Sequence, residues 1–465
     1  MINITAAIFV FYTATIFYIA IRAYTNTHDH ADFLLANRHL PGWLAALSAG
    51  ASDMSGWLLL GLPGLAFVAH QEAFWIAIGL GCGTYLNWRL VASRLHAQST
   101  RHRDSLTLPS YFANRYPDSA QLLRVTSAIM ILIFYVIYLS AGMVAAAKLF
   151  VAIFAMPYWS ALLVSAVVVI SYTMLGGFKA VVNTDALQAT LMIGALAAAS
   201  LMLFAGVEQY PTVTHELLDN DSKLGFIAIV SALAWGLGYP GQPHILARFM
   251  ATRDAEHIRG ATKIAVSWTL ICLSSALAIG ILAGAHPLLA DYDGDAEKIF
   301  IVATQLLFHP AIAGLITAAI LAAIMSTADS QLIIAASALY YDLASDRGHA
   351  QSQRAWLFGI RIVTLGLGCL SVFFALEPDS SVLGLVAYAW AGFGASFGPA
   401  VLISLWTERV SGRPIFFGMV AGAATVVVFE SYAVGSGELY SMIPGFTLNI
   451  LVVTLLHAIS SAKTG

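Results

Sequence analysis

The sequence predicts an all-α polytopic membrane protein with thirteen transmembrane helices. Of its 465 residues, 59% are hydrophobic and only 10% are charged, and the mean hydropathy is +0.80. Soluble domains carry about 25% charged residues, so this composition excludes a water-soluble fold. The apolar residues form runs that are long enough to cross a bilayer core of about 30 Å as helices. The spans are expected at 2–22, 42–69, 72–95, 122–150, 158–177, 183–207, 224–249, 259–285, 311–340, 355–376, 379–406, 413–432 and 438–460.

The basic residues predict which side of the membrane each loop occupies. With the N-terminus outside, 19 of the 22 Lys and Arg residues fall in loops and span ends on the inner side. Only Lys148, Lys223 and Lys298 fall outside. The positive-inside rule therefore predicts an external N-terminus, an internal C-terminus and an odd number of spans. The first run starts at Ile2 with no basic residue before it, so we expect a retained span and not a cleaved signal peptide.

Composition and motifs exclude several classes of protein. The formal net charge is −3 and no basic run appears, so nucleic-acid binding is not expected. The sequence has no Ser/His/Asp set, HExxH pattern or nucleotide-binding loop, so we expect neither an enzyme nor an organic cofactor. Cys82, Cys272 and Cys369 lack metal-ligand or disulfide spacing and are expected to be buried. No long hydrophilic linker occurs, which predicts one transmembrane domain over 1–465, surrounded by lipid.

A carboxylate lies in the middle of the second apolar span. Residues 47–63 read LSAGASDMSGWLLLGLP, with Asp53 among Ser and Gly residues that weaken a helix. An ionised Asp at the bilayer centre costs about 2.5–3.5 kcal/mol on insertion scales, so such residues usually have a function. Interrupted membrane helices are tolerated where they line a cavity or are buried in protein. The span therefore predicts an ion-coupled transport site.

The seventh span has a matching interruption. Residues 235–243 read WGLGYPGQP, five helices after the break at 51–56. Paired breaks at corresponding places indicate two inverted repeats with a substrate site between them. We expect a 5+5 repeat over helices 2–11, in which helices 2 and 7 are broken. Residues 42–406 would form this core, with helix 1 peripheral and two additional helices at 413–460. The alternative for each break is a proline kink without a ligand.

The ninth span carries small residues and hydroxyls on one helix face, because they recur at spacings of three and four. Sodium, a hard cation, prefers oxygen ligands, and a broken helix opposite would offer free carbonyls. Close helix packing is the alternative explanation for such a face. The residues are Ala323, Ser326, Thr327 and Ser330 on the ninth span, with Ala51 and Met54 at the break.

Two further carboxylates lie within spans. Asp329 stands beside Ser330, and Asp185 lies near the cytoplasmic start of the sixth span. They are expected to share a second cation or a proton. The alternatives are that Asp329 is a protonated or paired structural acid and that Asp185 caps its helix.

Aromatic residues accompany the breaks. Trp235 and Tyr239 are four residues apart and are expected to stack on one helix face, and Tyr138 lies in the fourth span. Aromatic walls beside a polar break suit a small, partly apolar zwitterion, although aromatic residues are common in membrane helices. Arg248 follows toward the cytoplasm, either as an anchor of the inner helix end or as a gating residue.

Five motifs resemble the sodium/solute symporter family, and within it the bacterial carriers of proline. The resemblance covers about residues 30–446, and the first and last motifs separate the proline carriers from sugar, sialic-acid and iodide carriers. It implies thirteen spans with a LeuT-type inverted repeat over helices 2–11. The motifs are ALSAGASDMSGWLLLGLPG, LTLPSYFANRY, GLGYPGQPHILARFMA, ILAAIMSTADSQL and LVAYAWAGFGASFGP.

The resemblance also implies functional sites. The sodium site falls on Ala51, Met54, Ala323, Ser326 and Thr327, with Asp53 beside it as an acid essential to coupling. The proline pocket includes Ser55, Trp57, Tyr138, Trp235, Tyr239 and Pro243. Relatives that use two sodium ions place the second near positions that match Asp185, Asp329 and Ser330.

Two departures from the family pattern affect these expectations. Asp329 stands where those relatives have a hydroxyl, which makes a second cation plausible and also leaves a titrating acid. Pro240 stands where the proline carriers have a bulky residue, which affects the shape of the pocket.

The resulting functional hypothesis is import of L-proline driven by a sodium gradient, in the bacterial inner membrane. A second hypothesis keeps the fold but changes the substrate to another small amino acid or a carboxylate such as pantothenate, coupled to sodium or protons. A third is a transporter-like sensor. Sensors of this kind usually carry a signalling domain after the last span, whereas this sequence ends soon after it, so we favour a carrier.

Overall fold

The protein is helical throughout the part described by this computed structural model, which comprises residues 4–24, 35–175, 177–207, 224–343, 353–432 and 439–462. Lys223 lies outside these residues. The helices of the first half are α1 (Ile4–Tyr24), η1 (Ala36–Arg38), α3 (Gly42–Asp53), η2 (Trp57–Gly61), α4 (Leu62–Val68), α5 (His70–Leu86), η3 (Asn87–Ala92), α6 (Ser93–Arg101), α7 (Leu108–Arg115), η4 (Pro117–Ser119), α8 (Ala120–Phe154), α9 (Tyr158–Leu175) and α10 (Phe178–Val207). Those of the second half are α12 (Phe226–Leu233), η5 (Ala234–Gly241), α13 (Pro243–Ala251), α14 (Ala255–Ala285), η6 (Ala296–Lys298), α15 (Ile299–Leu307), α16 (Pro310–Ser337), η7 (Ala338–Leu343), α18 (Gln353–Phe374), α19 (Val382–Trp406), α20 (Gly412–Tyr432) and α21 (Met442–Ala462).

Many of these helices have the length and apolarity needed to cross a membrane. Among the described residues, eight single helices qualify, and a ninth span results if α3 and η2–α4 are counted together. Shorter apolar helices occupy Ile4–Ile19, Tyr158–Met174 and Phe226–Gly241, where spans are predicted. The all-α membrane class is thus confirmed, whereas the count of thirteen spans stays a prediction.

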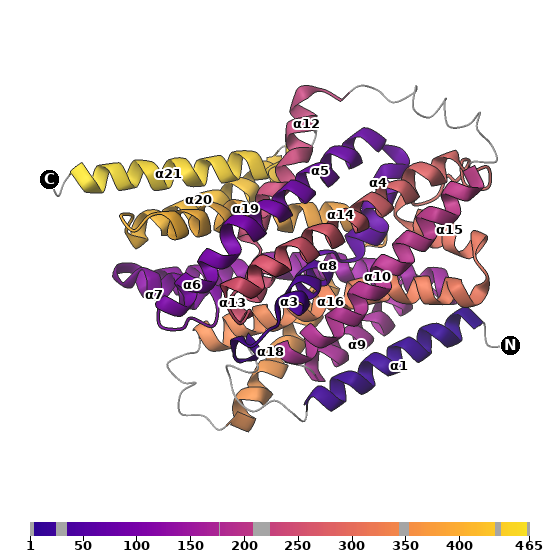
Figure 1. Cartoon of the computed structure of the whole chain (residues 1–465), viewed down its shortest axis with the longest axis horizontal. Coiled ribbons are helices and arrows are strands. Elements are labelled where there is room, and N and C mark those ends of the chain that lie inside the picture. Colours follow the sequence, from indigo (N-terminus) through magenta and orange to yellow (C-terminus); the bar gives the residue numbers. More distant parts are fainter. Residues whose placement is uncertain are drawn as a thin grey trace.

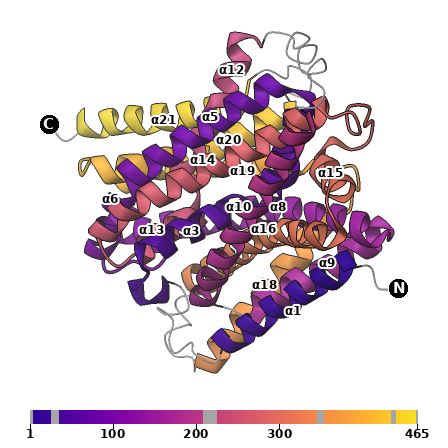
Figure 2. The same ribbon diagram turned by 45° about the vertical axis from the view of Figure 1, so that its right-hand side comes forward.

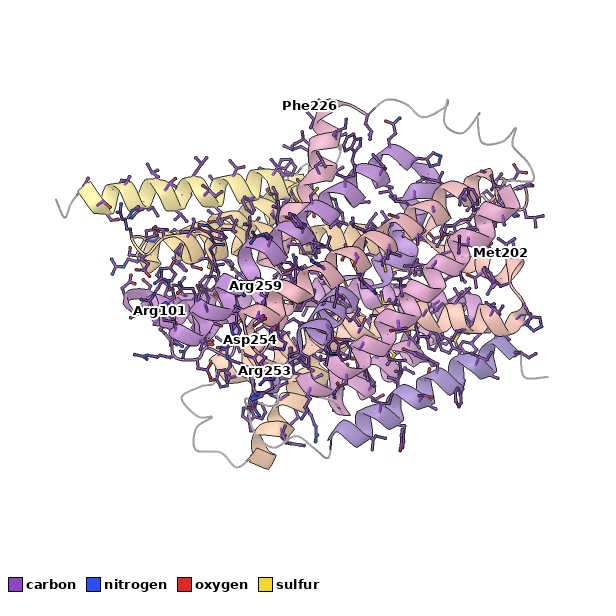
Figure 3. The ribbon with its side chains drawn as sticks, viewed as in Figure 1. Arg101, Met202, Phe226, Arg253, Asp254 and Arg259 are labelled. Carbon is purple, nitrogen blue, oxygen red and sulfur yellow. The ribbon has the colours of Figure 1, made fainter. Side chains whose placement is uncertain are left out.

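The long helices lie side by side along one axis (Figure 1). In α16, 83% of the most apolar window is buried inside the protein, against 28% in α20 and α21, so α16 belongs to the core and α20 and α21 to the periphery. Figure 2 shows α1 and α21 on opposite flanks of the bundle. In Figure 3, Arg101, Arg253 and Arg259 lie in the half of the molecule where α21 ends, and Met202 lies in the half where α1 begins.

The helix that contains Asp53 is interrupted. Helix α3 ends at Asp53, Met54 leaves the helical region with φ −90° and ψ 83°, and helical structure resumes at Trp57. The two pieces meet at an angle of 62°. Because Met54 and Ser55 do not continue the helix, carbonyl groups at the end of α3 lack helical N–H partners.

The second interruption has a different geometry. Between α12 and α13 the chain forms the 3-10 helix η5, and Gln242 is extended before Pro243 begins α13. A 3-10 helix has three residues per turn, so residues four apart do not share a face. The expectation that Trp235 and Tyr239 stack on one face is therefore wrong, because it assumed α-helical spacing.

Glycines hold η5 close to α5. A Cβ atom on Gly236 would lie 2.3 Å from the carbonyl oxygen of Gly79, and one on Gly83 would lie 2.5 Å from the carbonyl oxygen of Gly236. Real Cβ atoms do not approach so closely, so each of these positions requires glycine. The backbone contact fixes where η5 presents its aromatic residues.

An asparagine of α21 donates hydrogen bonds to backbone carbonyl groups near a proline in α19. Pro399 lies inside α19 and has no N–H, so the carbonyl of Ala395 loses its usual partner four residues on. Asn449 Nδ2 donates to the oxygens of Ala395 at 2.7 Å and Ser396 at 2.9 Å. Helix α21 is therefore attached to α19 by hydrogen bonds as well as by apolar packing.

The prediction for the cysteines was wrong at two positions. Cys272 is buried, but Cys82 and Cys369 are exposed on the outside of the helix bundle. A lipid-facing position is as apolar as the core, so hydrophobicity alone did not separate the two environments.

Candidate functional site

The end of α3 meets the middle of α16. Ser326 Oγ donates to the carbonyl oxygen of Ala51 at 2.7 Å and also lies 3.0 Å from the carbonyl oxygen of Ala323. The Thr327 hydroxyl, one residue on, is buried and has no hydrogen-bond partner among the described residues. Oxygen atoms from two helices thus converge beside the break, as a hard cation requires.

Asp53 connects the two interrupted spans. Tyr239 Oη, from η5, donates to Asp53 Oδ2 at 2.9 Å. The backbone oxygen of Asp53 accepts the indole N–H of Trp57 at 3.0 Å and the hydroxyl of Tyr138 at 3.4 Å. Asp53 Oδ1 is buried without a partner among the described residues. The freed end of α3 is thereby surrounded by three aromatic side chains predicted to line the substrate pocket.

Trp235 contacts two other aromatic rings. Its ring is 6.3 Å from that of Trp57, and it stacks on Tyr440 at 5.5 Å with an interplanar angle of 18°. The carbonyl of Trp235 accepts the indole N–H of Trp390 at 2.8 Å. Trp390 also makes an edge contact with Tyr239 at 5.1 Å. One connected aromatic cluster therefore joins η2, η5, α19 and Tyr440, which lies two residues before α21.

The walls of this site are in contact with each other. A cavity of about 10 Å³ lies beside Asp53 and Tyr239, which is room for one water molecule at most. Pro243 is buried as the first residue of α13. Because the rings of Trp57 and Trp235 are only 6.3 Å apart, an organic substrate can lie between them only if the two rings separate.

A buried arginine occupies the centre of the predicted second site. Arg248 and Asp185 form an ion pair of 3.1 Å, with both side chains fully buried. The guanidinium also donates to Ser48 Oγ at 3.0 Å, to Ser330 Oγ at 2.5 Å and to the oxygen of His244 at 3.0 Å. Such burial is tolerable because each charge is paired and hydrogen-bonded. Asp185 lies inside α10 and does not cap it.

Asp329 lies near this cluster but has its own partner. Its carboxylate contacts the hydroxyl of Thr173, on α9, and its Oδ2 atom has no partner among the described residues. Ser330, its neighbour, faces Arg248. The structure therefore connects Asp185 to Ser330 through Arg248 and places Asp329 against α9.

Comparison with known proteins decides the family. The model of the sodium:solute symporter family matches residues 33–422, which is most of the chain. The chain belongs to the sodium:solute symporter family. Its membership confirms the resemblance drawn from the five motifs and identifies a family of transporters.

Curated relatives in this symporter family are similar over almost their whole length. The chain is 42% identical to a protein named sodium/proline symporter of Salmonella typhimurium, covering 99% of this chain and 93% of that protein. It is 43% identical to the Escherichia coli protein of the same name, covering 99% and 94%. An osmoregulated proline transporter of Bacillus subtilis is 39% identical, covering 94% and 91%.

Solved structures of other transporters share the fold of this symporter. A sodium-coupled sialic acid symporter superposes with a TM-score of 0.82 at 16% identity, over 98% of this chain and 97% of that one. A transporter of the nucleobase-cation-symport-1 family gives a TM-score of 0.59 at 12% identity, over 93% and 95%.

Three residues that sequence reasoning missed or left open contact the predicted site residues. Trp390 and Tyr440 contact the aromatic wall from segments far along the chain. Trp390 lies within the motif LVAYAWAGFGASFGP, which was the available signal, whereas no local pattern distinguishes Tyr440 from other aromatic residues. Arg248 was expected at an inner helix end, yet it is fully buried. The available signal was the charge itself, because an arginine within an apolar segment needs a paired partner such as Asp185.

Proposed function

We propose that this protein is a sodium-coupled symporter that imports L-proline by alternating access. Full-length identity of about 42% to proteins named sodium/proline symporter supports the choice of ion and substrate. The contact of Ser326 with the carbonyl of Ala51 carries the argument for coupling, because it brings cation ligands to the break beside Asp53. Sodium bound there would hold α3 against α16.

The proposed sodium site uses oxygen atoms of α3 and α16. Asp53 supplies a nearby negative charge that also receives a hydrogen bond from Tyr239. The unpartnered hydroxyl of Thr327 supports the assignment, because a buried polar atom normally has a partner. The proposed residues are Ala51, Asp53, Met54, Ala323, Ser326 and Thr327.

The proposed proline pocket lies between the two breaks. Its aromatic residues already contact one another, and separation of Trp57 and Trp235 would create a site with apolar walls and polar backbone at its edge. Proline, a compact zwitterion with a hydrocarbon ring, matches that chemistry. The proposed residues are Ser55, Trp57, Tyr138, Trp235, Tyr239 and Pro243.

Asp185, Asp329 and Ser330 are proposed as a second cation or proton site. Two carboxylates and one arginine meet there, so the cluster gains charge balance from one further positive charge. Arg248 already supplies the first.

The proposed architecture has thirteen spans, with an inverted repeat over helices 2–11 and breaks in helices 2 and 7. We place the N-terminus outside and the C-terminus inside a bacterial inner membrane. Helix α1 begins at one end of the long axis and α21 ends at the other, which supports an odd number of spans (Figure 1). Residues 42–406 would form the transport core, helix 1 its flank, and 413–460 two additional helices in contact with lipid.

Uptake by purified protein in liposomes tests this function. We expect radiolabelled L-proline to accumulate only with an inward sodium gradient, and unlabelled proline to compete better than pantothenate or other small amino acids. A matched potassium gradient is the control. Sodium-independent uptake would contradict coupling, and uptake of pantothenate but not of proline would contradict the substrate.

A further inference from the structure

Tyr440 belongs to a segment outside the predicted transport core, yet it reaches the substrate wall. It precedes α21, one of the two helices that follow residues 42–406. Figure 1 shows the beginning of α21 beside α12, the first part of the interrupted seventh span. The backbone N–H of Tyr440 donates to Ser231 Oγ of α12 at 3.0 Å, which confirms this proximity.

The side chain of Tyr440 is held at both ends. Its ring stacks on Trp235 at 5.5 Å and 18°, the most parallel of the ring contacts made by Trp235. Its hydroxyl donates to the carbonyl oxygen of Ala387, on α19, at 2.7 Å. The ring therefore lies against η5 while the hydroxyl is bound to α19.

The rest of α21 keeps Tyr440 in this position. Met442 is fully buried between α19 and η5, where it lies 2.4 Å from the place of a Cβ atom on Gly394. About two turns further on, Asn449 binds the carbonyl of Ala395, which Pro399 leaves without a helical partner. A segment anchored in this way positions an aromatic ring with little freedom to move.

We propose that Tyr440 is a positioning residue of the substrate site, which holds the Trp235 ring in place and thereby sets the affinity and ring-size selectivity for the amino acid. The inference rests on the proposed function, because Trp235 is taken as a wall of the proline pocket. Tyr440 acts through Trp235: its ring stacks on the indole at 5.5 Å and 18°, whereas Trp57 makes a tilted contact at 6.3 Å and 41°. Removing Tyr440 leaves one side of the indole unsupported, so the pocket widens toward α21.

Two substitutions of Tyr440 distinguish the contribution of its ring from that of its hydroxyl. Tyr440→Phe keeps the stack and loses the bond to Ala387, so we expect the Kd for proline to rise by about three- to tenfold. Tyr440→Leu also loses the stack, so we expect a larger rise in Kd together with an improved ratio of pipecolate to proline binding, since pipecolate has one more ring carbon. Tyr432→Leu is the control, because Tyr432 is 86% exposed at the end of α20.

The readouts are proline binding at saturating sodium, competition by pipecolate and azetidine-2-carboxylate, and KM against maximal rate of uptake. A shift in the ring-size ratio with an unchanged maximal rate supports positioning, because a merely structural defect lowers the amount of active protein without changing selectivity. Unchanged Kd and unchanged ratio in Tyr440→Leu overturn the inference. If Tyr440→Leu is absent from the membrane, Tyr440→Phe provides the test, and an unchanged Kd together with an unchanged ring-size ratio in that variant overturns the inference. Wild-type protein without sodium-dependent proline uptake overturns the proposed function instead.

Discussion

Asp53 and Tyr239 show how single residues join the two interrupted spans. The carboxylate lies at the end of α3 and accepts the hydroxyl of Tyr239 from η5. Because its other oxygen has no partner among the described residues, the side chain retains the capacity to interact with a cation. If sodium binds at the end of α3 as proposed, the hydrogen bond between Tyr239 and Asp53 connects the ion to the proposed substrate wall.

Loss of the Asp53 charge should weaken sodium activation. Asp53→Asn keeps the size of the side chain, and we expect the sodium concentration for half-maximal proline uptake to rise at least about tenfold, since a charged partner of a cation contributes about 1.5–3 kcal/mol. Uptake measured against sodium concentration checks this. Asp254→Asn, at an exposed helix cap, is the control. An unchanged sodium dependence in Asp53→Asn would contradict the role.

The hydroxyl of Thr327 provides a second test at this scale. Thr327→Val has nearly the same shape but no oxygen, so we expect sodium activation to weaken by about ten- to a hundredfold. Thr327→Ser retains the oxygen and should remain within a few-fold of wild type. Equal effects of the two substitutions would indicate a packing role for this side chain.

Sequence reasoning singled out residues whose chemistry is unusual in a membrane and passed over residues whose chemistry is common there. Asp53 and the hydroxyls of α16 are conspicuous in an apolar sequence, and the structure brings Ser326 to Ala51. Trp390 and Tyr440 are aromatic residues among many, so only the fold reveals that they contact the site.

Among the elements, η5 shows that predicting where an α-helix is interrupted does not predict the conformation of the interrupted segment. Glycine and proline in WGLGYPGQP indicate where α-helical structure ends. They do not indicate that the segment forms a 3-10 helix, which depends on its backbone contact with α5. Tertiary packing therefore decided which way Trp235 and Tyr239 face.

Substitution of Gly236 tests this contact. A methyl group on Gly236 would lie 2.3 Å from the oxygen of Gly79, so Gly236→Ala should destabilise the protein by about 1–3 kcal/mol and lower its Tm in detergent. Gly194→Ala is the matched control, because no atom lies within 4 Å of the added group. A Tm for Gly236→Ala as high as that of the control would show that η5 and α5 can move apart freely.

For the whole molecule, a network of charges joins three elements at the end of the bundle predicted to be external. Lys148 of α8 pairs with Glu297 at 2.6 Å and with Asp295 at 2.9 Å. Glu297 also accepts hydrogen bonds from Ser381 and from two backbone N–H groups at the start of α19. The network fixes the segment before α15 to α8 and α19.

Removing the charge of Lys148 alone should destabilise the protein more than removing the charges of Lys148 and Glu297 together. Lys148→Met leaves the mostly buried Glu297 without its cation, for which we expect a loss of about 3–5 kcal/mol in stability. The double variant Lys148→Met, Glu297→Gln should recover part of the loss. Thermal unfolding of both variants checks this, and a double variant less stable than the single one would refute it.

Coupling between the two ligands is also a property of the whole molecule. If sodium at α3 and proline beside η5 stabilise the same arrangement, each must tighten the binding of the other by the same factor. Binding of labelled proline at several sodium concentrations, and of sodium at several proline concentrations, measures the two factors. Affinities independent of each other would exclude the coupling proposed here.

The fold class could be predicted because composition and apolar runs determine it, and the family motifs specify the arrangement. The contrast of Cys272 with Cys82 and Cys369 shows what could not be predicted: inside a bilayer, core and periphery are equally apolar. The distinction arises only when helices pack against each other.

The bond from Asn449 to the α19 carbonyls has a consequence for how this protein can be divided. A fragment ending at residue 406 would leave the carbonyl of Ala395 without a donor inside the membrane, where water is not available to replace it. The last two helices therefore cannot be deleted without loss of this hydrogen bond. Any shortened or fused version that keeps Pro399 has to supply its own donor, or exchange that proline for a residue with an N–H.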